Sequence, residues 1–86
     1  MQQVYLNGEF VAPEAAKISV MDRGFLFGDG VYEVIPVYSR RPFRLREHLR
    51  RLQSSLDKVR LANPHSDSEW TLLIERIVGE AEWEDQ

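Results

Sequence analysis

Apolar residues recur at helical spacing in the second half of the chain. One stripe consists of five aliphatic residues spaced by four, three, four and three positions: Leu45, Leu49, Leu52, Leu56 and Val59. Such spacing places the side chains on one face of a helix, which Asn63-Pro64 would end. A second stripe follows, formed by Trp70, Leu73, Ile74, Ile77 and Val78. The segment 66–69 reads Ser-Asp-Ser-Glu, which matches a capping box at the start of this second helix.

Strand patterns fill the first half of the chain. Two short apolar runs, 4–6 and 9–11, flank Asn7-Gly8, and this predicts a β-hairpin with a type I′ turn. The segment 31–38 is rich in β-branched and aromatic residues and predicts a strand, which Pro36 places at an edge or a bulge. A short strand is predicted at 42–44. Strands followed by two helices indicate an α+β fold.

Two segments have less regular patterns. Residues 21–30 contain Gly24, Gly28 and Gly30 and predict a sharp turn. After the second helix, which Gly79 is expected to stop, the acidic segment 80–86 is predicted to fray.

Length and composition narrow the classes of protein. The chain has 86 residues, which makes one small domain at most. It has no cysteine, so disulfides, zinc–thiolate sites and thiol nucleophiles are excluded, and no metal site is predicted. The first residues lack a signal-peptide pattern, and no apolar run is long enough to cross a bilayer. These features predict a cytoplasmic protein with no membrane partner.

Charge is distributed unevenly along the chain. The net charge is −3, yet residues 40–60 carry eight basic and two acidic side chains. A basic segment of this kind favours an anionic partner, either a phosphate group or a nucleic acid. On the first helix, His48, Arg51 and Ser55 lie at i, i+3 and i+7 beside the leucine stripe. Arg51 could donate paired N–H groups to a phosphate, or it could be a solvated arginine that covers the edge of the core.

The glycine-containing segment and the strand after it form the most specific stretch of the sequence. In that strand, Tyr32 and Val34 would lie on one face, with Val31 and Glu33 on the other. Together with the hairpin and the first helix, this stretch resembles the N-terminal region of the class IV aminotransferases, the fold-type IV pyridoxal-phosphate enzymes. The resemblance rests on four segments in order: 5–9 (YLNGE), 22–24 (DRG), 27–33 (FGDGVYE) and 43–52 (FRLREHLRRL).

The resemblance implies a fold, a cofactor and site residues. It identifies residues 1–86 as the small N-terminal α+β domain that lies over pyridoxal 5′-phosphate. Arg51 matches the arginine that binds the cofactor phosphate, and Tyr32 and Val34 match positions that face the substrate. Tyr32 and Val34 stand where branched-chain enzymes tend to have phenylalanine and glycine, so the likeness favours a D-amino-acid aminotransferase. A branched-chain aminotransferase and an aminodeoxychorismate lyase remain alternatives within the family.

The resemblance also implies that this chain is one part of a larger enzyme. In the family, the lysine that forms a Schiff base with the cofactor lies in a C-terminal domain beyond residue 86, and Lys17 and Lys58 do not match its position. No catalytic residue is therefore expected in this chain, which is predicted to be an incomplete fragment that is inactive alone and does not retain the cofactor. Amino acids and 2-oxo acids would be the substrates of the parent enzyme, and the fragment is expected to dimerise or exchange strands.

Outside the family, two alternatives remain. The basic segment could belong to a small nucleic-acid-binding module, but it has few interleaved aromatic residues and the rest of the chain is acidic, so a nucleic-acid partner is not predicted. A stand-alone interaction domain without catalysis is the other alternative.

Overall fold

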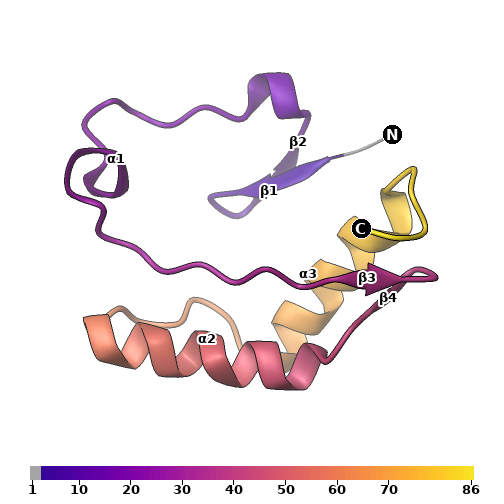
Figure 1. The fold of residues 1–86 in the computed structure, drawn as a ribbon. Coiled ribbons are helices and arrows are strands. Elements are labelled where there is room, and N and C mark those ends of the chain that lie inside the picture. The colour runs from indigo at the N-terminus through magenta and orange to yellow at the C-terminus, as the bar shows by residue number, and fades with distance from the viewer. Residues whose placement is uncertain (1–2) are drawn as a thin grey trace.

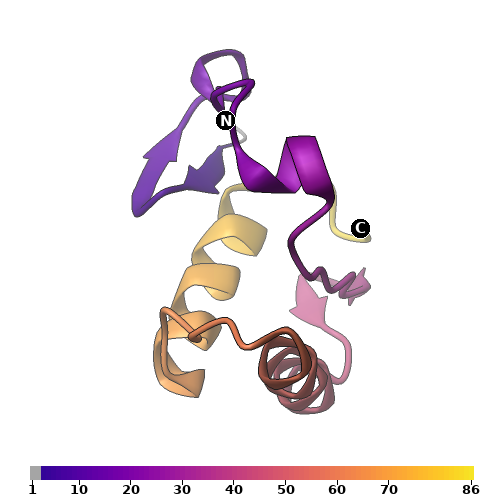
Figure 2. The ribbon, with the colours of Figure 1, turned by 90° about the vertical axis from the view of Figure 1, so that its left-hand side faces the viewer.

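The computed structural model describes residues 3–86, which form strands, two long helices and two short helical turns (Figure 1). In order these are β1 (Val4–Leu6), β2 (Glu9–Val11), the 3₁₀ turn η1 (Pro13–Ala15), α1 (Arg23–Phe27), β3 (Val37–Tyr38), β4 (Arg41–Pro42), α2 (Leu45–Val59) and α3 (Asp67–Glu80). The predicted α+β class, antiparallel strands followed by two helices, is confirmed. In Figure 2, α2 is seen end-on beside α3, and the hairpin and α1 lie above this helix pair.

The N-terminal hairpin forms as predicted. β1 and β2 pair antiparallel with Leu6 opposite Glu9, and Asn7 and Gly8 have φ angles of 51° and 86°. Positive φ at both central residues is what a type I′ turn requires, and asparagine and glycine tolerate it best. The hairpin contacts α3 through a cation–π pair, because the Arg76 guanidinium lies 3.8 Å from the centre of the Phe10 ring.

Residues 21–30 contain a helical turn as well as the predicted bends. Asp22 caps α1, since its Oδ1 accepts a hydrogen bond of 2.8 Å from the Gly24 N–H. Gly28 ends the helix in the left-handed conformation, with φ of 69°. The sequence therefore carried both helix-ending signals, but the five-residue helix between them was too short to show a periodic pattern.

The strand predicted over 31–38 is correct only at its end. β3 covers Val37–Tyr38 and pairs with β4, while residues 31–36 are extended without belonging to a sheet. The predicted strand at 42–44 is shorter and earlier in the structure, since β4 is Arg41–Pro42. Extended backbone counts as a strand only where a neighbour exchanges hydrogen bonds with it. Residues 31–36 instead run alongside α2 (Figure 1).

The two predicted helices are confirmed, and their apolar stripes face a small core. The buried residues are Val37, Leu49, Leu56, Val78 and Ala81. Val59, the last residue of the first stripe and of α2, is 48% exposed. α3 continues through Gly79 to Glu80, so the expected stop at Gly79 is wrong. A glycine disfavours a helix by about 1 kcal/mol relative to alanine, which the packing of Val78 and Ala81 can offset.

The capping box of α3 is present as predicted. The Glu69 N–H donates to Ser66 Oγ (3.2 Å), and the Ser66 N–H donates to Glu69 Oε1 (2.8 Å). Ser66→Ala is expected to lower the free energy of unfolding by about 1 kcal/mol, since it leaves a helix N–H without its acceptor. Urea unfolding followed by circular dichroism measures this change. Ser68→Ala, two residues further along the chain, is the control and should change the free energy of unfolding by less than about 0.5 kcal/mol. Equal losses in both variants would contradict the capping role.

The acidic C-terminal segment does not fray, contrary to the sequence prediction. Gln86 and Val37 exchange two backbone hydrogen bonds of 2.7 Å, and the Ser39 N–H donates to Asp85 Oδ1 at 2.8 Å. Arg40, the first residue of the basic segment 40–60, donates from Nη1 to the Ala81 carbonyl oxygen at 3.0 Å, at the end of α3. A cation at a helix C-terminus is favourable, and these contacts fix the segment beside β3.

Candidate functional site

The predicted substrate-facing residues lie on the outer side of the extended segment 31–36. Tyr32 is 84% exposed and Val34 is 69% exposed, whereas Val31, Glu33 and Ile35 between and beside them are only partly exposed. The period-two alternation predicted from the sequence is therefore present although the segment pairs with no strand there. Tyr32 and Val34 are thus the exposed residues of the segment, while the side chain of Glu33 between them is largely buried.

Glu33 joins this segment to α2 through a cluster of three side chains. Its carboxylate accepts hydrogen bonds from two nitrogens along one edge of the Arg51 guanidinium: Nε lies 2.8 Å from Oε2 and Nη2 lies 2.9 Å from Oε1. His48 Nδ1 lies 2.8 Å from the same Oε1. We call Glu33, His48 and Arg51 the Glu33 cluster. Its members come from α2 at i and i+3 and from the extended segment, so it forms only when these two elements pack together.

Burial and charge in the Glu33 cluster are unevenly shared. The side chains of Glu33 and His48 are 11% and 15% exposed, while that of Arg51 is 64% exposed. Hydrogen bonds from Arg51 and then His48 lower the pKa of the Glu33 carboxyl below its usual value, against an opposing effect of burial. The Glu33 carboxylate in turn raises the pKa of the Arg51 guanidinium. The Arg51 guanidinium is therefore a permanent cation at the surface, and the Glu33 carboxylate partly neutralises its charge.

Arg51 retains donors that could bind an anion. Glu33 occupies Nε and one hydrogen of Nη2, and within residues 3–86 the structure shows no hydrogen bond from Nη1. A guanidinium presents five N–H donors in a planar fork, so the remaining edge can bind a phosphate or carboxylate with two parallel hydrogen bonds. The Arg51 side chain therefore fits the phosphate of the cofactor that the sequence implies.

Glu33 was not predicted to be a site residue, and His48 was placed beside the leucine stripe of the first helix without a role. A signal for both was available. The alternation of 31–35 placed the Glu33 carboxylate on the inward face, where an unpaired charge is costly. His48 and Arg51 lie one helical turn apart on α2, so they could reach a single carboxylate. The missing information was that α2 packs against this segment.

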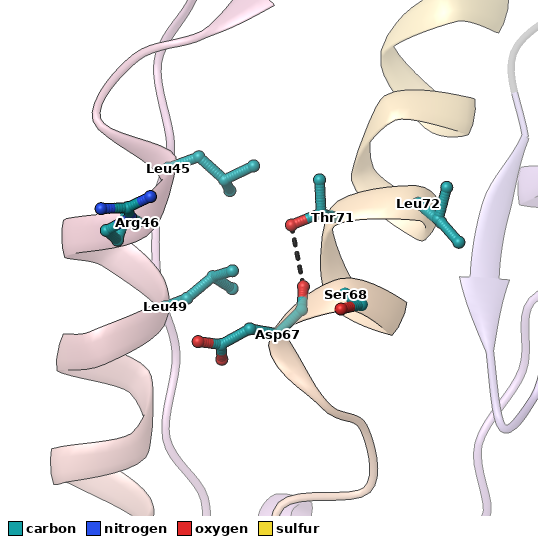
Figure 3. Close-up of a pocket in the computed structure, with 7 residues that line it drawn as sticks. All are labelled: Leu45, Arg46, Leu49, Asp67, Ser68, Thr71 and Leu72. Carbon is teal, nitrogen blue, oxygen red and sulfur yellow. Dashed lines mark hydrogen bonds between the residues drawn. The ribbon is translucent and has the colours of Figure 1, made fainter.

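Two hollows adjoin the helix pair. A cavity of about 230 Å³ lies beneath the extended segment, next to the Glu33 cluster, and its lining includes Ile35, Leu52 and Ile74. A larger, open groove of about 680 Å³ lies between the N-terminal halves of α2 and α3 (Figure 3). Leu45 and Leu49 point into this groove from α2, and the Thr71 hydroxyl donates to the Asp67 carbonyl oxygen (2.8 Å) on the α3 side.

Of the helices formed by residues 3–86, none has the length and apolar character needed to span a bilayer. The same residues bring together no group of three histidine or acidic side chains that could hold a metal ion.

The pKa shift of Glu33 predicts a dependence of stability on acid pH. Because the folded pKa is lowered, the carboxylate stabilises the fold at pH values above its unfolded pKa of about 4.3. This stabilisation is lost as pH falls through the lower, folded pKa. The urea midpoint of the wild type should therefore fall between about pH 5 and pH 2, and Glu33→Gln should remove that component of the fall. An unchanged pH slope in Glu33→Gln would contradict the assignment.

Comparison with known protein families decides where the chain belongs. The family profile described as amino-transferase class IV matches residues 30–85, the part that contains the Glu33 cluster, α2 and α3. The chain belongs to the class IV aminotransferases. This confirms the resemblance drawn from the sequence motifs.

Individual class IV proteins show the same relationship. The chain is 42% identical over 78 residues to the D-alanine aminotransferase of Staphylococcus aureus, an alignment that covers 91% of this chain. It is 41% identical over 78 residues to the D-alanine aminotransferase of Listeria monocytogenes, again covering 91% of this chain. The chain spans only 28% and 27% of the length of these two relatives.

A solved structure confirms the fold. The branched-chain aminotransferase of the thermophilic archaeon Thermoproteus uzoniensis, determined with norvaline, superimposes with a TM-score of 0.86 and 30% sequence identity. The superposition covers 98% of this chain and 30% of that enzyme. The arrangement of strands and helices described above is therefore that of a class IV aminotransferase.

Proposed function

We propose that this chain is the N-terminal small domain of a pyridoxal-phosphate-dependent aminotransferase, in which Arg51 binds the cofactor phosphate. The observation that carries the proposal is the state of Arg51: the side chain is exposed, its guanidinium is fixed by Glu33 on one edge, and its other edge can donate to an anion. Membership of the class IV family supplies the identity of that anion.

In this proposal the residues of the chain bind and orient the cofactor and the substrate, while the cofactor supplies the chemistry. Pyridoxal phosphate, when bound, would withdraw electrons from the carbon that carries the amino group of the substrate, so that this carbon can lose a proton. Arg51 would hold the phosphate by charge-assisted hydrogen bonds. Tyr32 would donate its phenolic hydroxyl to the substrate carboxylate, and Val34 would pack against the substrate side chain. The parent protein would thereby transfer amino groups between amino acids and 2-oxo acids.

For the substrate we propose a D-amino acid. Tyr32 and Val34 favour this class at the sequence level, and the two curated relatives described above are D-alanine aminotransferases. The structural relative is a branched-chain enzyme, and its 0.86 TM-score keeps that substrate class as the second candidate. The cytoplasmic location predicted from the sequence is retained as part of the proposal.

A chimera tests the proposed function. Residues 1–86 would replace the matching segment of the S. aureus D-alanine aminotransferase, and the purified chimera would be assayed with D-alanine, L-leucine and aminodeoxychorismate. We expect transamination of D-alanine at a rate within about tenfold of the parent, because both halves of the site would be present. Preference for L-leucine would support the second candidate. A chimera that is folded and carries the cofactor, yet is inactive with all three compounds, would overturn the proposal.

We further propose that the chain self-associates. A run of apolar side chains before and within α1 is exposed: Val20 and Met21 at 71% each and Phe25 at 69%. Exposed apolar surface of this kind marks an interaction site or leads to aggregation. Light scattering coupled to size-exclusion chromatography should show a dimer, by apposition of these surfaces or by strand exchange. A clean monomer at high concentration would refute the proposal.

A further inference from the structure

The arrangement of the Glu33 cluster raises the question of what the carboxylate does there. Glu33 is the only acidic group bonded to Arg51 within residues 3–86, and its own side chain is 11% exposed. A carboxylate held this close to Arg51 neutralises part of the positive charge that an incoming phosphate needs. On charge alone, Glu33 should weaken an anion site at Arg51. Its position must therefore be weighed against what it does for the geometry of the guanidinium.

The hydrogen bonds fix Arg51 in one orientation. Glu33 contacts Nε at 2.8 Å and Nη2 at 2.9 Å, so both bonds lie along the same side of the guanidinium plane. An arginine side chain has several freely rotating bonds, and an exposed one samples many rotamers. Two parallel bonds to a fixed carboxylate remove most of this freedom before any ligand arrives. The opposite edge, which includes Nη1, then has a constant direction.

His48 fixes the carboxylate in its turn. The Nδ1–Oε1 separation is 2.8 Å, and since a carboxylate oxygen only accepts, Nδ1 of His48 is the donor in this bond. The His48 side chain is itself only 15% exposed and lines the cavity beneath the extended segment together with Leu52 and Trp70. The two largely buried side chains, His48 and Glu33, thus hold the exposed side chain of Arg51.

From this geometry we propose that Glu33 and His48 are positioning residues that pre-orient Arg51 for a phosphate group. The inference rests on the proposed function, because it takes the phosphate as the ligand of Arg51. Pre-orientation lowers the conformational cost of binding, and this gain exceeds the loss from partial neutralisation of the charge. Neither residue is assigned a contact with the phosphate.

The test uses the 86-residue chain and pyridoxine 5′-phosphate, which has no aldehyde and cannot react with lysine. Affinity would be measured by NMR titration. Glu33→Gln is expected to weaken binding about tenfold, since the neutral amide offers Arg51 and His48 one acceptor oxygen in place of two and carries no charge. The Arg51 Nε–H signal, sharp in the wild type, should broaden. Glu75→Gln on α3 is the control for loss of one negative charge and should leave both readouts unchanged.

Three outcomes separate the possibilities. Tighter binding by Glu33→Gln would show that neutralisation of charge outweighs orientation and would overturn the inference, and unchanged affinity would overturn it as well. If Arg51→Ala also failed to weaken binding, the proposed phosphate site itself would be wrong. Weaker binding by Arg51→Ala with no change in Glu33→Gln would leave the proposed function standing and remove only the positioning role.

A second pair of variants covers the case in which Glu33→Gln does not fold. The side-chain amide of asparagine can place an N–H near the position of His48 Nδ1, whereas leucine has no donor. His48→Asn is therefore expected to keep the phosphate affinity within about threefold of the wild type, and His48→Leu to lose about as much as Glu33→Gln. Equal affinities for the Asn and Leu variants would overturn the inference.

Discussion

Leu49→Ala is expected to abolish the cooperative unfolding transition of the chain. The Leu49 side chain is 5% exposed and lies where α2 meets α3, beside both the groove and the cavity. Truncation of a buried leucine costs about 2–5 kcal/mol. A domain of this size is stable by about 0.1 kcal/mol per residue, and this one buries few side chains. The expected loss is thus a large fraction of the total.

Thermal unfolding followed by near- and far-ultraviolet circular dichroism measures this effect. The matched control is Leu72→Ala, the same change at a side chain that is 68% exposed on α3. The control should alter the free energy of unfolding by no more than about 0.5 kcal/mol. If Leu49→Ala kept a cooperative transition within about 5 °C of the wild type, the contact between α2 and α3 would not be the centre of the core.

The second large effect concerns Arg51→Lys in the chimera with the D-alanine aminotransferase. Lysine keeps the positive charge but has no planar fork, so it cannot bind Glu33 on one edge and a phosphate on the other. Loss of charge-assisted bonds of this type corresponds to about 10- to 100-fold in affinity. We expect the chimera to release its cofactor during dialysis, and the cofactor absorbance that remains on the protein measures the loss.

Two controls accompany this variant. Arg50→Lys changes the neighbouring arginine, which is exposed and lies on a different side of α2, and it should retain the cofactor. Pyridoxal, which lacks the phosphate, should bind the wild type and Arg51→Lys with equal affinity. A chimera with Arg51→Lys that retains the cofactor as well as the parent does would contradict the assignment of the phosphate to Arg51.

The elements that the sequence predicts well are those specified by nearby residues. The hairpin depends on Asn7-Gly8 alone, and α3 depends on a cap and a stripe within fifteen consecutive positions. Their hydrogen bonds close over a few residues, so local chemistry decides them. The Asp22 and Gly28 caps of α1 were equally local, but a helix shorter than two turns gives no periodicity to recognise.

The features that escaped the sequence depend on contacts between distant segments. Whether residues 31–36 form a strand depends on a partner, not on their β-branched side chains. The fixed C-terminal segment depends on Val37 and Arg40, which lie far upstream. The candidate site divides in the same way: Tyr32, Val34 and Arg51 came from matching motifs, whereas the contacts of Glu33 depend on the packing of α2 against the extended segment.

The attachment of the C-terminal segment to β3 has a consequence for the order of folding. The hydrogen bond from Ser39 to Asp85 joins residues 46 positions apart in the sequence. It therefore closes a longer loop than the side-chain bond from Arg40 to Ala81, which spans 41 positions. Helices and the turn that connects them form within about microseconds. A contact between distant segments forms later, because closing a long loop costs conformational entropy. The α2–α3 pair should assemble first and the C-terminal segment should dock last. Substitutions in residues 82–86 would then accelerate unfolding and leave the folding rate nearly unchanged.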